Sequence, residues 1–245
     1  AEICLLWIAS AVIVPCPATA AEMEAVPFRG TWVATAEVAP WHVGRDKGFF
    51  VEEGINISIP EGQGSALNAK LVGAGTLNFA ACDYGTMMKG VEEGLPIKGI
   101  FCYFQSSPMA IVFPADLRIT NPKQLEGKRV ASTPGSSVVQ IYPAFAKATG
   151  VDESKIKMVM VPTGSMLPLL LKREVDALLI YWPNAIAELK EKGMEAQYIP
   201  FNKYGVNVLG TGVIVNTNFL EKNHDLAKRF VRAAQRSWAY ALKNP

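Results

Sequence analysis

Residues 128–149 read KRVASTPGSSVVQIYPAFAKAT, and this stretch carries the pattern that decides the fold. The segment Lys128–Ala131 predicts a β-strand, Thr133–Ser137 supplies turn residues, and Ser136–Thr149 has the apolar spacing of a helix. The same order of strand, turn and helix recurs along the chain. This recurrence predicts an α/β protein with parallel sheets covered by helices.

Two series of such units are expected. The expected strands are Thr31–Thr35, Ile55–Ile59, Leu77–Ala81, Ile97–Tyr103, Ala110–Phe113, Lys128–Ala131, Lys157–Val161, Ala177–Tyr181, Tyr198–Ile199 and Gly212–Val215. The expected helices are Ala39–Glu53, Ser65–Ala74, Tyr84–Glu93, Asn121–Leu125, Ser136–Thr149, Met166–Lys172, Asn184–Lys192 and His224–Leu242. We assign residues 27–109 plus 209–245 to a first lobe and residues 112–206 to a second. The two crossings between the lobes predict a hinge of paired strands, with a ligand cleft between the lobes.

Three strand-to-helix turns share one chemistry: Gly62–Ala66, Thr133–Ser137 and Thr163–Ser165. In each turn a glycine permits a tight bend, and a serine can serve as the N-cap of the following helix. The unpaired N–H groups and the helix dipole then favour an electron-rich ligand group. Each turn taken alone is explained by capping, but three at the same topological position favour a cleft.

Aromatic and acidic residues follow the ends of the expected strands. Trp182 ends a strand and precedes Pro183, so we expect no immediate helix there and take Trp182 as the best stacking residue. Glu37 and Asp83 would favour an amine or amidine, since the binding turns contain no Lys or Arg. The full set of candidate ligand-binding residues is Glu37, Trp41, Gly64, Ser65, Asp83, Tyr84, Gln105, Ser136, Ser137, Thr163, Trp182 and Tyr204.

The N-terminal residues resemble a secretory signal. Ile3–Val14 is an uncharged apolar run, and Ala18-Thr19-Ala20 follows it as a cleavage-site pattern. We therefore predict a partial signal peptide over residues 1–20, export to the periplasm, and a soluble mature protein. A buried helix or strand is the alternative explanation of this run.

The composition excludes several classes of protein. The chain has 245 residues, is 50% hydrophobic and 19% charged, and has a net charge of +2, as a globular protein does. It has no cluster of Lys and Arg, so nucleic-acid binding is not expected. The only histidines are His42 and His224, and neither a P-loop nor a G-x-S-x-G elbow occurs, so we expect no metal site, cofactor or catalytic triad.

Two cysteines, Cys82 and Cys102, remain after residue 20, and we expect both thiols to be free. The returning strand Gly212–Val215 is expected to lie between the strands that carry them. That placement would hold the two sulfur atoms beyond disulfide distance.

Several stretches resemble, in the same order, the sulfonate/taurine and thiamine-pyrimidine-precursor group of solute-binding proteins, the family that also contains fungal pyrimidine synthases. The matching stretches are Gly44–Phe50, Glu53–Ile55, Gly62–Ser65, Gly73–Phe79, Gly94–Lys98, Asn121–Lys128, Val175–Leu178, Gly210–Gly212 and Phe219 to Phe230. The resemblance covers nearly all of residues 28–245. It implies a two-lobed type II periplasmic-binding-protein fold, and because members usually continue further, a C-terminal truncation here.

The resemblance also implies a function. We expect a monomeric solute-binding component of an ABC importer that closes around a small aromatic or heterocyclic, pyrimidine-like solute and delivers it to a permease in the inner membrane. A sulfonate, nitrate or aromatic carboxylate is the alternative solute, although Glu37 stands where family members often carry His or Asn. A pyrimidine-precursor synthase or a sensor domain is the alternative class. The synthase branch uses a cysteine-rich motif and an active-site His, and this chain has neither.

Overall fold

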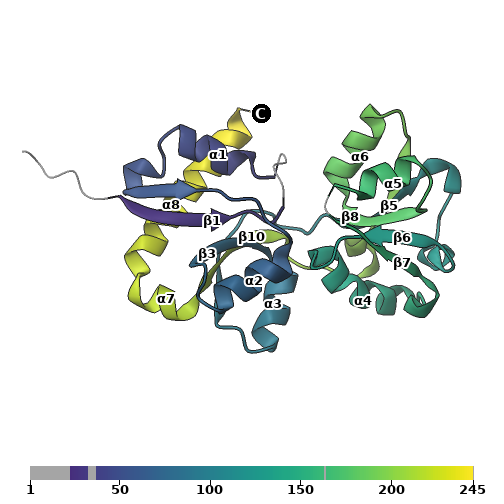
Figure 1. Ribbon diagram of the computed structural model, residues 1–245, viewed down its shortest axis with the longest axis horizontal. Helices are drawn as coiled ribbons and strands as arrows, with labels where there is room; N and C mark the ends of the chain where they lie inside the picture. Colours follow the sequence, from purple (N-terminus) through teal and green to yellow (C-terminus); the bar gives the residue numbers. More distant parts are fainter. Residues whose placement is uncertain (1–22, 33–36, 163, 245) are drawn as a thin grey trace, which may run out of the picture.

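The computed structural model describes residues 23–32, 37–162 and 164–244, which form two lobes, each built on a five-stranded sheet (Figure 1). The sheet of lobe 1 has the order β2-β1-β3-β10-β4, and the sheet of lobe 2 has the order β7-β6-β8-β5-β9. The strands of lobe 1 are β1 (Glu24–Arg29), β2 (Ile55–Ser58), β3 (Phe79–Asp83), β4 (Ile97–Cys102) and β10 (Thr211–Asn216). The strands of lobe 2 are β5 (Met109–Pro114), β6 (Arg129–Ser132), β7 (Lys157–Met160), β8 (Ala177–Tyr181) and β9 (Ala196–Pro200).

Helices cover both sheets, as the alternating sequence pattern predicts. They are α1 (Ala39–Asp46), α2 (Ser65–Gly73), α3 (Tyr84–Glu92), α4 (Ser137–Thr149), α5 (Met166–Leu171), α6 (Trp182–Glu191), α7 (Thr217–Lys222) and α8 (His224–Lys243). Short 3₁₀ helices lie at Val51–Glu53, Ala115–Leu117, Pro122–Leu125, Glu153–Lys155 and Phe201–Tyr204. The α/β class and the two-lobed architecture are confirmed, but the sheets are mixed rather than parallel. In lobe 1, β10 runs antiparallel to both its neighbours, and in lobe 2 β5 does so.

The first strand lies earlier than predicted, at Glu24–Arg29 instead of Thr31–Thr35. Val26 and Phe28 alternate with exposed residues and face the core, which is the two-residue period of a strand. Pro27 obscures this pattern, because proline is disfavoured inside sheets. It is tolerated here, where β1 pairs only with β2, since pairing with β3 begins at Phe28.

The expected helix Ala39–Glu53 is broken in two. Helix α1 ends at Asp46, Gly48 adopts a left-handed φ of 77°, and a 3₁₀ helix follows at Val51–Glu53. A left-handed glycine just after the last helical turn is a frequent helix terminator.

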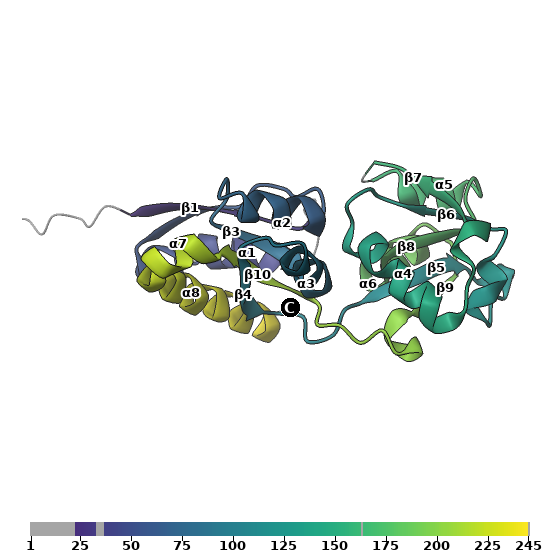
Figure 2. The same cartoon turned by 90° about the horizontal axis from the view of Figure 1, so that it is seen from below.

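Two hydrogen-bonded crossings connect the lobes (Figure 2). One leads from β4 to β5 and the other from β9 to β10. The backbone N–H of Gly210 donates to the carbonyl of Phe104 at 2.9 Å, and that of Ser107 donates to Val208 at 3.1 Å. The crossings are therefore hydrogen-bonded to each other, although neither forms the strand that the sequence predicted for the hinge.

Strand β10 keeps the two cysteines apart. In its register, Gly212 lies opposite Cys82 on one side and Cys102 on the other. Both thiols are free, so this prediction is confirmed.

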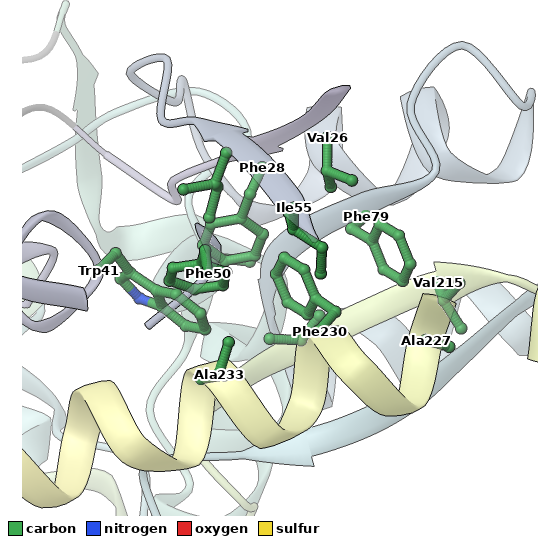
Figure 3. Packing of buried hydrophobic residues seen from close by; sticks show 14 of the residues in the cluster. Val26, Phe28, Trp41, Phe50, Ile55, Phe79, Val215, Ala227, Phe230 and Ala233 are labelled. Carbon is green, nitrogen blue, oxygen red and sulfur yellow. The ribbon is translucent and has the colours of Figure 1, made fainter. Parts of the chain in front are cut away.

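The core of lobe 1 is an aromatic cluster between the sheet and helices α1 and α8 (Figure 3). Phe230 of α8 stacks on Phe79 of β3 with ring centroids 4.8 Å apart, and Trp41 lies 4.2 Å from Phe28. This cluster attaches the C-terminal helix to the first lobe by apolar burial, which is the main source of its stability.

The predicted signal peptide lies outside the described residues. Among the residues that are described, no helix has the length and apolar character needed to cross a membrane.

Candidate functional site

A cavity of about 210 Å³ lies between the two lobes. Both lobes line it. Its lining residues are Thr31, Trp32, Glu37, Gly64 and Ser65 from lobe 1, and Ser136, Ser137, Val138, Gly164, Met166, Leu167, Leu179, Ile180, Tyr181, Asn184, Ala185 and Glu188 from lobe 2. Most of the lobe 2 wall is apolar. The hydroxyl and carboxyl groups of the lining belong to Thr31, Glu37, Ser65, Ser136, Ser137, Tyr181 and Glu188. An apolar pocket with a few polar groups is the usual form of a small-molecule site.

The first two glycine–serine turns meet at this cavity. The N–H of Ala66 in lobe 1 donates to the carbonyl of Gly135 in lobe 2 at 3.2 Å. Gly64 has a φ of 102°, and a Cβ atom there would lie only 2.6 Å from the Gly135 oxygen. Only glycine permits this approach, so the chain at Gly64 is adapted to contact between the lobes.

The serines of the three turns differ from the prediction that each caps a helix. Ser136 does cap α4, accepting from the N–H of Val139 at 3.4 Å. The N-cap of α2 is Gly64, and the Ser65 hydroxyl accepts instead from the N–H of Asp83 at 3.0 Å. Ser165 precedes α5 but makes no side-chain cap bond. Backbone geometry therefore decides which serine reaches an amide. Thr163 lies outside the described residues.

Asp83 lies at the end of β3 and caps α3, where its Oδ1 accepts from the N–H of Thr86 at 3.2 Å. Its Oδ2 accepts from the hydroxyls of Tyr181 at 3.0 Å and Ser107 at 3.4 Å. The side chain is 0% exposed. Burial raises the pKa of Asp83 to about 6, although its hydrogen bonds oppose that shift. Asp83 does not line the cavity itself but acts on it through Tyr181.

Glu37 lines the cavity directly. Its Oε1 accepts from the hydroxyl of Thr31 at 3.1 Å, and the hydroxyls of Thr211 and Tyr103 also bond to its carboxyl group. Burial raises the pKa of Glu37, and the nearby negative charge of Asp83 adds to this shift. The site therefore holds two carboxyl groups with raised pKa values, the buried Asp83 and the half-buried Glu37. None of the described lining residues is Lys, Arg or His.

The cavity contains an aromatic residue that the sequence did not single out, Trp32. Its indole lies against the apolar cluster of lobe 2, although the residue belongs to lobe 1. Trp32 falls within Thr31–Thr35, the segment predicted as the first strand. Nothing in that prediction distinguishes it from an ordinary strand residue. Thr31, Tyr181, Asn184 and Glu188 were also absent from the candidate set. An Asn184-to-Glu188 spacing of one helical turn is the signal that could have found the last two.

Trp182 occupies a different position from the one expected. Helix α6 begins at Trp182 itself, because proline is well tolerated in the first turn of a helix. The indole stacks on Tyr198 with centroids 4.5 Å apart and an interplanar angle of 6°. Trp182 is not among the residues that line the cavity.

Four other candidates also lie away from the cavity. Trp41 is 1% exposed in the core of lobe 1. Tyr84 packs over Gly99 and Gly212 of the lobe 1 sheet, and Tyr204 packs edge-on against Phe145 in lobe 2. Gln105 is exposed on a crossing between the lobes. We therefore leave these four residues, and Trp182, out of the site proposed below.

The described residues contain no group of three or more His, Cys, Asp or Glu side chains that could hold a metal ion.

Comparison with known proteins places the fold in a family. The family model described as NMT1/THI5 like matches residues 35–245. The chain belongs to the NMT1/THI5-like family. Solved structures agree with this fold: the alkanesulfonate-binding protein SsuA of Xanthomonas axonopodis pv. citri, bound to MOPS, superposes with a TM-score of 0.70 at 14% identity, over 89% of this chain and 74% of that one.

Relatives in this family carry different functional names. The riboflavin-binding protein RibY of Chloroflexus aurantiacus is 22% identical over 94% of this chain and 66% of its own length. The formylaminopyrimidine-binding protein of Halalkalibacterium halodurans is 22% identical over 91% of this chain and 68% of its own. A 4-amino-5-hydroxymethyl-2-methylpyrimidine phosphate synthase of Aspergillus parasiticus is 21% identical over 91% and 68%. The chain spans about two thirds of the length of these relatives.

Proposed function

We propose that this chain is the solute-binding component of an ABC importer, which captures a small aromatic or heterocyclic solute between its lobes. The observation that carries this proposal is the cavity itself, to which the starts of α2 and α4 contribute from opposite lobes. A solute in it contacts both lobes only when the lobes are together. Binding therefore shifts the population toward the closed form by hinge motion at the paired crossings.

The size of the cavity supports a single-ring solute. A cavity of about 150 Å³ holds benzene, and this one, at about 210 Å³, is only moderately larger. Trp32 and the apolar lobe 2 wall provide flat and apolar contact for such a ring. The site we propose consists of Thr31, Trp32, Glu37, Gly64, Ser65, Ser136, Ser137, Tyr181, Asn184 and Glu188, with Asp83 behind Tyr181.

The alternative solute, a sulfonate, nitrate or aromatic carboxylate, is less well supported by the charges. The described lining includes the carboxyl groups of Glu37 and Glu188 and no basic side chain. An anion would have to bind through the backbone amides at the helix starts alone, close to these carboxyl groups. Coulomb repulsion in a partly buried site makes that arrangement costly.

Export to the periplasm, a permease in the inner membrane as partner, and a monomeric state complete the proposal. The apolar run before residue 20 supports export, and the periplasmic binding proteins with the same fold support both export and a permease partner.

An enzyme of the pyrimidine-synthase type is the second candidate function, because two relatives carry that name. The two candidates differ in the fate of the bound molecule. A binding protein releases the solute unchanged, whereas a synthase converts it.

Native mass spectrometry of the protein purified from cells tests the main proposal, together with small-angle X-ray scattering. We expect a retained small solute, recovered chemically unchanged after incubation, and a smaller radius of gyration when it is present than after its removal. A protein that retains nothing and whose scattering is unchanged by any candidate solute would contradict the proposal. Conversion of the solute would favour the enzyme.

A further inference from the structure

Of the five hydroxyl groups in the described cavity lining, those of Thr31, Ser136, Ser137 and Tyr181 point their hydrogens at the protein, whereas that of Ser65 accepts from the N–H of Asp83. The Thr31 hydroxyl donates to Glu37 Oε1 at 3.1 Å. The Tyr181 hydroxyl donates to Asp83 Oδ2 at 3.0 Å. Each hydroxyl has only one hydrogen, so what these two groups have left to offer a ligand is an oxygen lone pair.

The hydroxyls of Ser136 and Ser137, at the start of α4, also direct their hydrogens toward the protein. The Ser137 hydroxyl donates to Tyr181 Oη at 3.1 Å. The hydroxyls of Ser136 and Ser132 lie 3.3 Å apart, and Ser132 already donates to the carbonyl of Leu179 at 3.0 Å. The hydrogen between the two serines must therefore come from Ser136. Both serines, like Thr31 and Tyr181, present acceptors to the cavity.

Two carboxyl groups, that of the buried Asp83 and that of the half-buried Glu37, hold this arrangement in place. An ionised carboxylate has no hydrogen to donate, so it can only accept. Asp83 accepts from Tyr181 and Ser107, and Glu37 accepts from Thr31, while Thr211 and Tyr103 also bond to it. Hydrogen bonds to a charged acceptor are stronger than neutral ones, so the hydroxyls keep these directions when a ligand enters.

We propose that Asp83 and Glu37 are positioning residues that keep the side-chain wall formed by Thr31, Glu37, Ser136, Ser137 and Tyr181 an acceptor of hydrogen bonds, so that the solute turns N–H donors toward it. This inference rests on the proposed function and names its solute class: an amine, an amidine or an amino-substituted ring. The backbone amides at the starts of α2 and α4 are hydrogen-bond donors. They therefore suit acceptor atoms elsewhere on the same solute.

Such a wall should discriminate between solutes of the same shape that carry either a hydrogen-bond donor or an acceptor at this position. An amino group places its hydrogens against the lone pairs of the wall. A carbonyl or carboxylate oxygen in the same place would face acceptors, and a buried acceptor without a donor is strongly penalised. We expect the donor member of a matched pair to bind at least about tenfold more tightly, a difference that one unmet buried hydrogen bond supplies.

Two matched pairs of probes test this expectation at pH 7.5, on protein freed of retained solute. The neutral pair is 4-aminopyrimidine and pyrimidin-4-one, and the charged pair is benzamidine and benzoate. Titration followed by NMR gives the ratio of dissociation constants for each pair. Tighter binding of the donor in both pairs supports the inference. Equal or tighter binding of the acceptor in either pair overturns it, and so does failure of both donors to bind.

The Asp83→Asn variant separates positioning from a structural role. The asparagine amide can donate to Tyr181 Oη, which frees the tyrosine hydrogen to point into the cavity. We expect the preference for the donor probe to fall by about tenfold or more, whereas a merely structural defect would weaken both probes equally and overturn the assignment. The matched control is Asp152→Asn, which also removes a capping carboxylate but lies outside the cavity.

A second variant keeps the test decisive if Asp83→Asn does not fold. Glu37→Gln replaces the other carboxyl group with an amide, whose NH2 must donate to one of the surrounding hydroxyls and so frees a hydrogen that the carboxylate had held, so the preference should again fall. Scattering recorded with each probe distinguishes the two proposals. Closure around benzoate but not around benzamidine would support the solute-binding function and overturn the proposal of an acceptor wall. Tight binding of benzamidine without closure retains the wall and overturns closure as the mechanism.

Discussion

The hydroxyl of Tyr181 donates to Asp83 Oδ2 at 3.0 Å, a hydrogen bond between the two lobes that spans 98 residues of sequence. Tyr181 ends β8 in lobe 2 and lines the cavity, whereas Asp83 ends β3 in lobe 1 and caps α3. The bond can form only when the lobes are together. We therefore expect this bond to link occupation of the cavity to the proposed closure.

Replacing Tyr181 by Phe should weaken binding. A hydrogen bond to a charged group contributes about 1.5–3 kcal/mol, so affinity for the solute recovered from the protein should fall roughly 10- to 100-fold in isothermal titration calorimetry. Tyr142→Phe makes the same chemical change in lobe 2 outside the cavity lining and should leave the affinity unchanged. Equal affinities for the two variants would show that the contact contributes nothing to closure.

Replacing Asp83 by Asn should change how stability depends on pH. The pKa of Asp83 is raised to about 6 in the folded protein from an ordinary 3.8, so between these values the folded state holds a proton that the unfolded state has released. Stability contributed by this group is therefore highest below about pH 4 and is lost as the pH rises toward 6. The loss is on the order of 2–3 kcal/mol, from about 1.4 kcal/mol per pKa unit.

Asparagine cannot ionise and is an equally good N-cap. The variant should thus be more stable than the parent at pH 8, and the difference should shrink toward pH 4. Urea unfolding at several pH values measures this. Because other carboxyl groups with lowered pKa values, such as that of Glu53, act in the opposite direction, the comparison is between variant and parent at each pH. A difference that does not vary with pH would contradict the prediction.

Replacing Gly64 by Ala should prevent close contact between the lobes. The added Cβ would lie 2.6 Å from the Gly135 oxygen, and the φ of 102° is itself unfavourable for alanine. Gly75→Ala is the matched control, since Gly75 also has a positive φ, of 73°, but nothing lies within 4 Å of its Cβ position. Both variants should lose stability, by about 1–3 kcal/mol for backbone strain. Only Gly64→Ala should abolish the solute-induced decrease in radius of gyration. The same decrease in both variants would mean that the lobes close without the Gly64–Gly135 contact.

Replacing Trp32 by Ala should remove the stacking surface of the cavity. The loss is about 1–3 kcal/mol, or roughly a five- to hundred-fold weaker affinity. Trp182→Ala deletes the same side chain where it stacks on Tyr198 outside the cavity. That variant should lower the melting temperature and leave affinity within about threefold. If Trp182→Ala weakens binding more than Trp32→Ala, the solute lies elsewhere.

Cys82 and Cys102 should react as two separate thiols. Burial strongly raises the pKa of Cys82 and also raises that of the half-buried Cys102, so both should be slow toward Ellman's reagent in the folded state, Cys82 the slower. In the chain from residue 21 onward, unfolding without reductant should release two reactive thiols. Finding none would mean that the strand order β3-β10-β4 is wrong.

Much of the fold follows from local pattern. The strand Ala177–Tyr181 was predicted at its observed bounds, and the separation of the cysteines followed from the returning strand. These features depend on hydrophobic period and on turn residues, which act over a few neighbouring positions. Two boundary errors had local causes that single residues explain: Pro27 obscured the first strand, and Gly48 ended α1 early.

Which side chains meet in the cavity was decided by the tertiary structure. The sequence singles out Trp182 for stacking and leaves Trp32 an ordinary strand residue, but packing sends Trp41 into the core, Trp182 onto Tyr198 and Trp32 into the cavity. The direction of the Tyr181 hydrogen likewise depends on Asp83, which reaches it only after both lobes have formed. The sequence by itself determined the elements and the class of the fold, because backbone preference and hydrophobic period are local. The polarity of the site was left to contacts between distant segments, because a hydrogen bond is directional and acts only when folding has brought its partners together.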